Sequence, residues 1–240
     1  MFKKLIFGFS LFATLLFGAT FDDGLNALNK SDFQIAFTIF EDLALKGDAK
    51  AQYYLGAMYM QKLGVKWNPK KAVEWWEKSA NQGFAAAQTN LGYMYEKGSG
   101  GLKQDSKKAF EWYQKSALQG DVEAQYNFGV SYEKGIGATQ DYAKAVEWYE
   151  KSANQGYANA QFNLGNMYGK GQGVKQDYAK AFELYEKAAA QGDTRAQVNL
   201  GAMYFYGEGV EKDKNVAKEW FKKACDGGNQ AGCNNYKKLN

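Results

Sequence analysis

Few side chains in this 240-residue chain could do chemistry, because it contains no histidine. Without an imidazole there is no Ser-His-Asp or Cys-His triad, no histidine zinc site and no histidine acid–base catalysis. The only cysteines are Cys225 and Cys233. Two thiols cannot complete a tetrahedral metal site, and their spacing is not the C-x-x-C of a redox dithiol. We therefore expect no metal site and no cofactor.

Ser131 and Lys134 are spaced like the S-x-x-K element of serine β-lactamases. The K-T-G element is missing, and the one Ser-Asp dipeptide, at Ser31, is not followed by asparagine. Methionine occupies the place of Ser131 elsewhere in a repeating pattern, at Met58, Met94, Met167 and Met203. We interpret Ser131 as a substitution at an inward position. A weak hydrolase that uses another group stays open.

A row of amides is the stronger candidate site. The triplet N-L-G, or N-F-G, recurs along the chain, and its asparagine is the residue of interest. In the first copy a tyrosine stands in place of the asparagine. The candidate groove residues are Tyr54, Asn90, Asn127, Asn163 and Asn199. An amide offers two donors and one acceptor, which suits the backbone of an extended peptide. The alternative is that each asparagine bonds the adjacent helix and fixes the stacking of the repeats.

These residues lie on a repeat of 36 or 37 residues. The glycine of the N-L-G triplet recurs at Gly56, Gly92, Gly129, Gly165 and Gly201. A fixed period of this size predicts a solenoid of stacked units. A glycine costs roughly 1 kcal/mol in a helix interior. Its recurrence therefore predicts that a neighbouring helix approaches closely at this position.

Each unit is predicted to hold two helices. In the first, Ala160, Leu164, Met167 and Tyr168 share one helical face. The second helix follows a G-x-G loop and begins after a capping residue. The predicted caps are Asp32, Asn68, Asp105, Asp141, Asp177 and Asp213. First helices are expected to begin near Asp48, Phe84, Asp121, Tyr157 and Asp193, and a closing helix is expected near residues 229–238.

The repeat unit resembles Sel1-like repeats, which are relatives of the tetratricopeptide repeat. The resemblance rests on the string A-Q-x-N-L-G-x-M-Y, the G-x-G loop and the D-Y-A-K-A string. The resemblance implies an all-α fold, a right-handed α/α solenoid of antiparallel helix pairs. It also implies that the first helices line a concave groove. We therefore expect a scaffold that binds a peptide or protein segment in this groove.

The N-terminus reads as a signal peptide. A basic start at Lys3 and Lys4 precedes an apolar run and small residues near Ala19. We expect residues 1–19 to be removed and residues 20–240 to form one domain of about six repeats with a capping helix. The alternative is a retained anchor. The product would be exported, periplasmic or secreted, without a stable membrane anchor. Without residues 1–19 the chain has 28 basic and 26 acidic residues. This small net positive charge does not favour a nucleic-acid partner.

The two cysteines fit a disulfide. In register, Cys225 takes the place of Ala189 and Cys233 that of Gln197, so they are expected to face each other across a turn. The C-x7-C spacing resembles the bridge of cysteine-rich Hcp-type proteins of helicobacters, which carry it in successive repeats, whereas this chain has one. Those proteins have been described as penicillin-binding proteins and weak β-lactamases. The resemblance therefore implies β-lactam hydrolysis as an alternative function.

Overall fold

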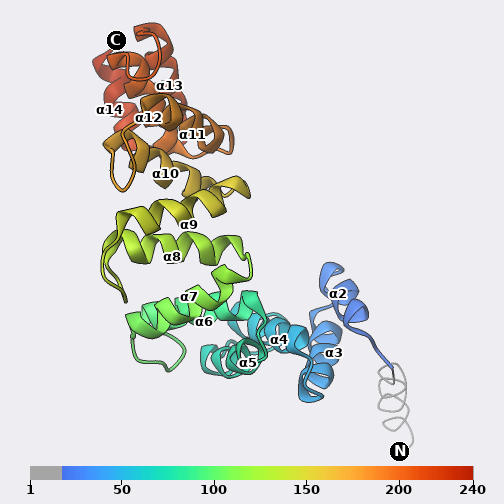
Figure 1. Cartoon of the computed structure of the whole chain (residues 1–240). Coiled ribbons are helices and arrows are strands. Elements are labelled where there is room, and N and C mark those ends of the chain that lie inside the picture. The colour runs from blue at the N-terminus through green and yellow to red at the C-terminus, as the bar shows by residue number, and fades with distance from the viewer. Residues whose placement is uncertain (1–17, 240) are drawn as a thin grey trace, which may run out of the picture. The chain divides into compact units, whose positions relative to one another are not determined.

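The computed structural model describes residues 18–239, which form an all-α repeat solenoid (Figure 1). This part of the chain contains thirteen helices and no strand. They make six helix pairs and a closing helix, as predicted. Most of the predicted signal segment, residues 1–17, lies outside the described residues. Between residues 18 and 239, no helix combines the length and apolar character that crossing a bilayer requires.

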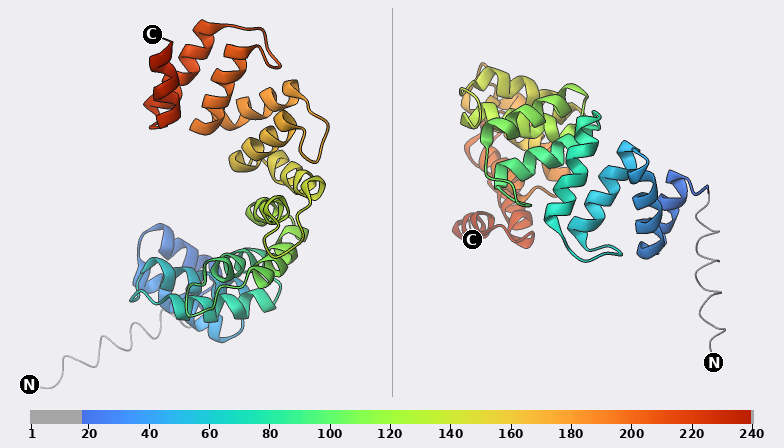
Figure 2. Two further views of the ribbon diagram at one scale, coloured as in Figure 1. Left: turned by 90° about the vertical axis from the view of Figure 1, so that its left-hand side faces the viewer. Right: turned by 90° about the horizontal axis from the view of Figure 1, so that it is seen from below.

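The described part of the chain divides between Ser116 and Ala117 into two compact units, and the division falls within α7. The helices up to this division are α2 (Phe21–Asn29), α3 (Phe33–Leu45), α4 (Ala49–Gln61), α5 (Pro69–Asn81), α6 (Ala85–Lys97) and α7 (Ser106–Leu118). The second unit contains α8 (Val122–Lys134), α9 (Tyr142–Asn154), α10 (Ala158–Lys170), α11 (Tyr178–Ala190), α12 (Thr194–Tyr206), α13 (Lys214–Asp226) and α14 (Gln230–Lys238). Within this unit each helix packs against the next along the chain, from α8 to α14 (Figure 2).

The predicted close approach at the repeating glycine is confirmed. A methyl group added at Gly165 would lie 2.7 Å from Cε1 of Tyr185, which comes from the second helix of the same pair. The same contact joins Gly56 to Trp76, Gly92 to Tyr113, Gly129 to Tyr149 and Gly201 to Phe221. A side chain in the first helix would therefore collide with the ring, because the two helices meet there with no room for a Cβ atom.

Most of the predicted caps are confirmed. Five of them accept a hydrogen bond from a backbone N–H two or three residues later: Asn68, Asp105, Asp141, Asp177 and Asp213. Asp32 occupies the cap position of α3, but the prediction of a side-chain cap there was wrong. Its ψ of 59° is smaller than the 98° of Asp141, so its carboxylate does not point at the first N–H groups of the helix.

A buried glutamine links the two helices that meet at each repeat boundary. Gln161 is 5% exposed, and its Nε2 donates to the carbonyl of Ala153 in α9 at 3.3 Å. Its Oε1 accepts from Nε2 of Gln191 at 2.9 Å. Gln197 repeats the first bond, to the Ala189 carbonyl at 3.4 Å. Its Oε1 has no donor within residues 18–239, because glycine stands at position 227, where Gln191 would recur.

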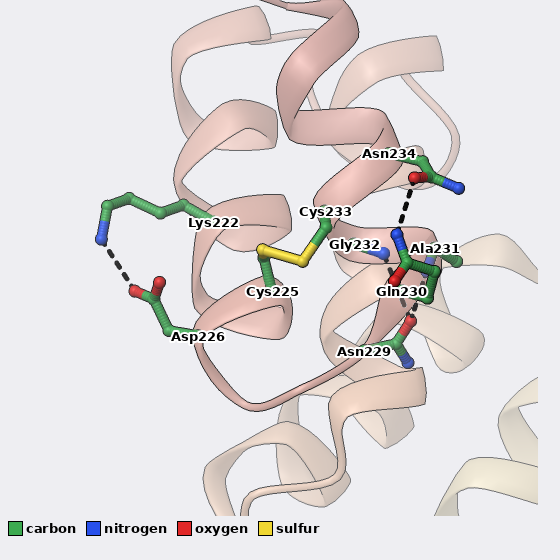
Figure 3. Close-up of a disulfide and its surroundings, with 9 residues drawn as sticks. All are labelled: Lys222, Cys225, Asp226, Asn229, Gln230, Ala231, Gly232, Cys233 and Asn234. Carbon is green, nitrogen blue, oxygen red and sulfur yellow. Dashed lines mark hydrogen bonds and ion pairs between the residues drawn. A yellow bond between two sulfur atoms is a disulfide. The ribbon is translucent and has the colours of Figure 1, made fainter.

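The predicted disulfide is present in the structure (Figure 3). It joins Cys225 in the last turn of α13 to Cys233 in α14, with their Cα atoms 4.4 Å apart. In the repeats before it, the same two positions are linked by the glutamine-to-alanine hydrogen bond. The last turn of the solenoid therefore carries a covalent bond where the earlier turns carry a hydrogen bond.

We expect Gly165→Ala to lower the free energy of unfolding by about 1–3 kcal/mol, because the new methyl group overpacks the ring of Tyr185. Gly169→Ala is the matched control in the same helix. Its methyl group would lie 3.7 Å from the Tyr185 hydroxyl, which is an ordinary contact distance. We therefore expect the free energy of unfolding to rise by about 0.5–1 kcal/mol, because alanine is a better helix former than glycine. Urea denaturation followed by circular dichroism measures both. Equal effects of the two variants would contradict the role of the close contact.

Replacing both cysteines with alanine is expected to lower the free energy of unfolding by roughly 2–3 kcal/mol, since the disulfide closes a short loop. The variant Cys225→Ala with Cys233→Gln restores the residues of the earlier repeats. We expect it to recover about 0.5–1.5 kcal/mol through the glutamine hydrogen bond. Urea midpoints of the three proteins, measured without reductant, test this order. A glutamine variant no more stable than the alanine variant would show that the hydrogen bond does not substitute for the disulfide.

Candidate functional site

The predicted asparagines all lie half-buried on the first helices of their pairs. Each stands two residues before the close-packed glycine, beside the inward leucine or phenylalanine. This position lies at the edge of the buried face, where a side chain reaches both the next helix and solvent. In the second unit, Asn127, Asn163 and Asn199 come from α8, α10 and α12. We call these three residues the asparagine row.

Asn163 takes part in a hydrogen-bonded chain across three helices. Its Nδ2 donates to the Tyr149 hydroxyl at 3.2 Å, and this hydroxyl donates to a carboxylate oxygen of Glu133. Burial, and then the hydrogen bond to Glu133, raise the pKa of Tyr149 well above its usual value. The hydroxyl therefore stays protonated at neutral pH and acts as the donor to Glu133.

Asn199 takes part in a different arrangement. Its Nδ2 donates to Oδ1 of Asn166 at 3.2 Å, and the Tyr185 hydroxyl donates to the same oxygen at 2.8 Å. Burial raises the pKa of Tyr185 to about 12, while the Asn199 amide beside the hydroxyl lowers it. Asn166 was not among the predicted site residues, because asparagine occurs at this position of the repeat only once.

The other predicted site residues have different surroundings. Asn90 and Asn127 make no side-chain hydrogen bond with any other residue of the described chain. Tyr54 packs in an aromatic cluster, with ring centroids 5.4 Å from Phe21 and 5.2 Å from Phe40. In this environment Tyr54 contributes to the packing of α2 and α3 on α4. The structure thus places Asn163 and Asn199 in hydrogen-bonded groups and leaves the amide of Asn127 available.

Arg195 adds a positive charge and an aromatic contact beside the asparagine row. Its guanidinium lies 4.3 Å from the centroid of the Phe162 ring. It also donates to Oδ1 of Asn159 at 2.7 Å, and it forms an ion pair with Asp193 at 2.5 Å. The surface of α10 and α12 therefore combines amides, one aromatic ring and one arginine, and each of these groups can contact a peptide.

The arrangement does not favour Ser131 as a nucleophile. The residue is 6% exposed, and its Oγ donates to the carbonyl of Asn127 in the same helix at 2.9 Å. A nucleophile needs an adjacent base that takes its proton, and a backbone carbonyl cannot do this. In the described part of the chain, no three acidic, cysteine or histidine side chains could hold a metal ion together.

Tyr149 and Tyr185 were not among the predicted site residues. Their rings pack on Gly129 and Gly165. Their hydroxyls, however, extend past the glycines to the polar side chains of the first helices. Tyrosine, rather than tryptophan or phenylalanine, at this position of the repeat was the available signal.

Comparison with known proteins identifies the repeat. Five consecutive stretches match the family model of the Sel1 repeat: residues 49–84, 85–121, 122–157, 158–193 and 194–229. A Sel1 repeat protein from Oxalobacter formigenes is 33% identical over 88% of this chain and 84% of its own, with a TM-score of 0.83. A protective antigen present in uropathogenic Escherichia coli strains, with an SLR fold, is 32% identical over 93% of this chain, with a TM-score of 0.84. The chain spans 49% of the length of that antigen.

The cysteine-rich protein B of Helicobacter pylori is 28% identical over 55% of this chain and 94% of its own. Its TM-score of 0.44 is too low to support an argument about function. No curated protein matches the chain significantly.

We expect no serine-dependent hydrolysis of β-lactams, because the Ser131 hydroxyl is buried and bonded to its own helix. The purified protein, with its disulfide formed, is incubated with a chromogenic cephalosporin beside a Ser131→Ala variant. The two proteins should give the same rate as buffer. Turnover that disappears in the variant would make Ser131 catalytic and would contradict this reading.

Proposed function

This chain belongs to the Sel1 repeat family, and from that premise we propose that it binds an extended peptide segment of a partner protein along the asparagine row of its second unit. Solenoids expose a long surface built from equivalent positions of successive repeats. A segment laid across several repeats meets the same side chain each time. This geometry suits a partner that is itself extended, and the Sel1 repeat is accordingly a scaffold for protein–protein contact.

The observation that carries the proposal is the amide of Asn127. It is half-buried on α8, at the position of Asn163 and Asn199, and it makes no hydrogen bond within the described residues. An amide at this depth can donate to and accept from a peptide backbone. Its polar atoms are open to solvent, so a bound segment would replace the water on them with backbone groups.

The residues beside the row support the same reading. Phe162 and the guanidinium of Arg195 stack on each other, and the guanidinium also has an amide partner in Asn159. The guanidinium is already paired with the carboxylate of Asp193, so it offers a planar, oriented donor group that is held in place. The surface is therefore suited to a polar segment more than to an apolar helix.

We also propose that the protein acts outside the cytoplasm. The N-terminal sequence has a basic start, an apolar run and small residues near Ala19, which are the parts of a signal peptide. The disulfide between Cys225 and Cys233 fits an oxidising compartment. Periplasmic and secreted locations are both compatible with these features.

A displayed library of random peptides, selected against the immobilised full chain, tests the binding function. We expect Asn127→Ala to weaken binding of the selected peptides by about 10-fold, close to 1.4 kcal/mol, with a urea midpoint no lower than that of the wild type. Asn154→Ala is the matched control, because it removes the same amide from an exposed place at the end of α9. Unchanged affinity in Asn127→Ala, or failure to select any peptide, would contradict the proposal.

Asn163→Ala should behave differently from Asn127→Ala. It removes the donor to the Tyr149 hydroxyl, so we expect a loss of about 0.5–1.5 kcal/mol of stability in addition to weaker peptide binding. Urea denaturation and the binding assay, applied to both variants, separate the two roles. A loss of stability in Asn127→Ala equal to that in Asn163→Ala would make stacking the common role of the row.

A further inference from the structure

We propose that a pocket beside Gly169 binds a carboxylate, supplied by a glutamate side chain of the partner peptide. This inference rests on the proposed function and names the chemistry of one contact within it. The pocket lies among α10, α11 and α12 of the second unit and has a volume of about 430 Å³. It contains Asn199 of the asparagine row, so the pocket is part of the surface on which the peptide is proposed to lie.

The preceding pair of helices shows what normally fills this place. Glu133 stands four residues after the close-packed Gly129, and its carboxylate accepts the hydrogen bond of Tyr149. In the first unit Glu96 stands at the same position, and its carboxylate accepts from the Tyr113 hydroxyl at 2.9 Å. The chain thus binds a carboxylate of its own at this position in two repeats, each time on a buried tyrosine hydroxyl.

Position 169 has the same surroundings without the glutamate. The carbonyl of Glu133 accepts from Nε2 of Gln140 at 2.8 Å, and the carbonyl of Gly169 accepts from Nε2 of Gln176 at 2.8 Å. Both glutamines also donate to a tyrosine hydroxyl two residues later. The backbone and the loop are therefore alike in the two repeats. Two side chains differ, because glycine takes the place of Glu133 and Asn166 takes the place of Val130 and accepts from the Tyr185 hydroxyl.

The absence of a side chain leaves space. A Cβ atom added at Gly169 would lie 3.7 Å from the Tyr185 hydroxyl and 3.8 Å from Cβ of Ala181. Both are ordinary contact distances, whereas at Gly165 the same addition would be 2.7 Å from the Tyr185 ring. A glutamate from another molecule could therefore reach the hydroxyl without displacing the helices.

The lining of the pocket is rich in hydrogen-bond donors. The Tyr185 hydroxyl and Nδ2 of Asn199 both donate to Oδ1 of Asn166, so a bound carboxylate would take the place of this amide oxygen as their acceptor, and Lys170 brings a positive charge. Nδ2 of Asn166 has no acceptor within the described residues. Glu208 is the one acidic residue of the lining. An acceptor with two oxygens, such as a carboxylate, matches more of these donors than a neutral amide does.

The direct test is an NMR titration with two small probes, N-acetyl-glutamate N-methylamide and N-acetyl-glutamine N-methylamide. The glutamate probe should shift the side-chain amide signals of Asn166 and Asn199 in a saturable way. The glutamine probe should bind at least about 10-fold more weakly, because it lacks the charge. Equal binding of the two probes, or no saturable shift with the glutamate probe, would overturn the carboxylate site.

Two variants locate the binding. Gly169→Glu restores the glutamate of the preceding repeats, and we expect it to abolish binding of the probe by occupying the pocket. Ala143→Glu adds the same charge at an exposed place on α9 and should bind as the wild type does. If Gly169→Glu does not fold, Tyr185→Phe replaces it. This variant removes the hydroxyl donor alone, and it should weaken binding of the glutamate probe by about 5- to 10-fold. Unchanged binding in the folded variant overturns the proposal.

The peptides selected from the library separate this inference from the proposed function. Enrichment of glutamate, with affinity lost in Gly169→Glu, supports both. Peptides that lose affinity in Asn127→Ala and keep it in Gly169→Glu would leave the scaffold function standing and overturn the carboxylate pocket. Saturable binding of the glutamate probe, combined with failure to select any peptide, would overturn the peptide-binding function. The pocket would then remain a site for a smaller acid.

Discussion

Each repeat depends on the contact between an aromatic ring of the second helix and a glycine of the first. The ring of Tyr185 lies 2.7 Å from where a Cβ atom of Gly165 would be, and a glycine meets an aromatic ring in this way in all six helix pairs, since Gly24 meets Phe40 in the first. Because the helices meet at this distance, the small and apolar residues around the glycine are buried, and the polar residues next to it come to the edge of the interface. The asparagine row and the tyrosine hydroxyls owe their positions to this contact.

The repeat period predicted the fold closely, since the helix pairs, five of six side-chain caps and the disulfide follow from positions 36 or 37 residues apart. A periodic pattern constrains backbones, because every repeat must pack on a copy of itself. It was less informative about hydrogen bonds. The partner of Asn163 lies 14 residues away on another helix, and Asn199, at the same position of the repeat, bonds Asn166 instead. The hydrogen-bond partner of each asparagine therefore depends on single substitutions among the neighbouring residues.

Departures from the repeat are where this solenoid differs from a uniform array. Glycine replaces a glutamate at position 169 and opens a pocket. Serine replaces a methionine at position 131, and its hydroxyl bonds its own helix. Cysteines replace an alanine and a glutamine at the last turn and join α13 to α14. The period therefore indicates the scaffold, and the exceptions to it indicate where to look for specific chemistry.

The unpaired oxygen of Gln197 has a consequence for how a chain of this kind can lengthen. In an interior unit such as residues 158–193, Gln161 donates to the Ala153 carbonyl of the preceding unit and accepts from Gln191 of its own unit, so a duplicated copy would leave neither group unmatched. The unit of residues 194–229 lacks the second of these hydrogen bonds. Gly227 offers no donor to Gln197, and Cys233 stands where the next glutamine would be. A duplication of residues 194–229 would therefore copy the unmatched oxygen, whereas a duplication of residues 158–193 would not.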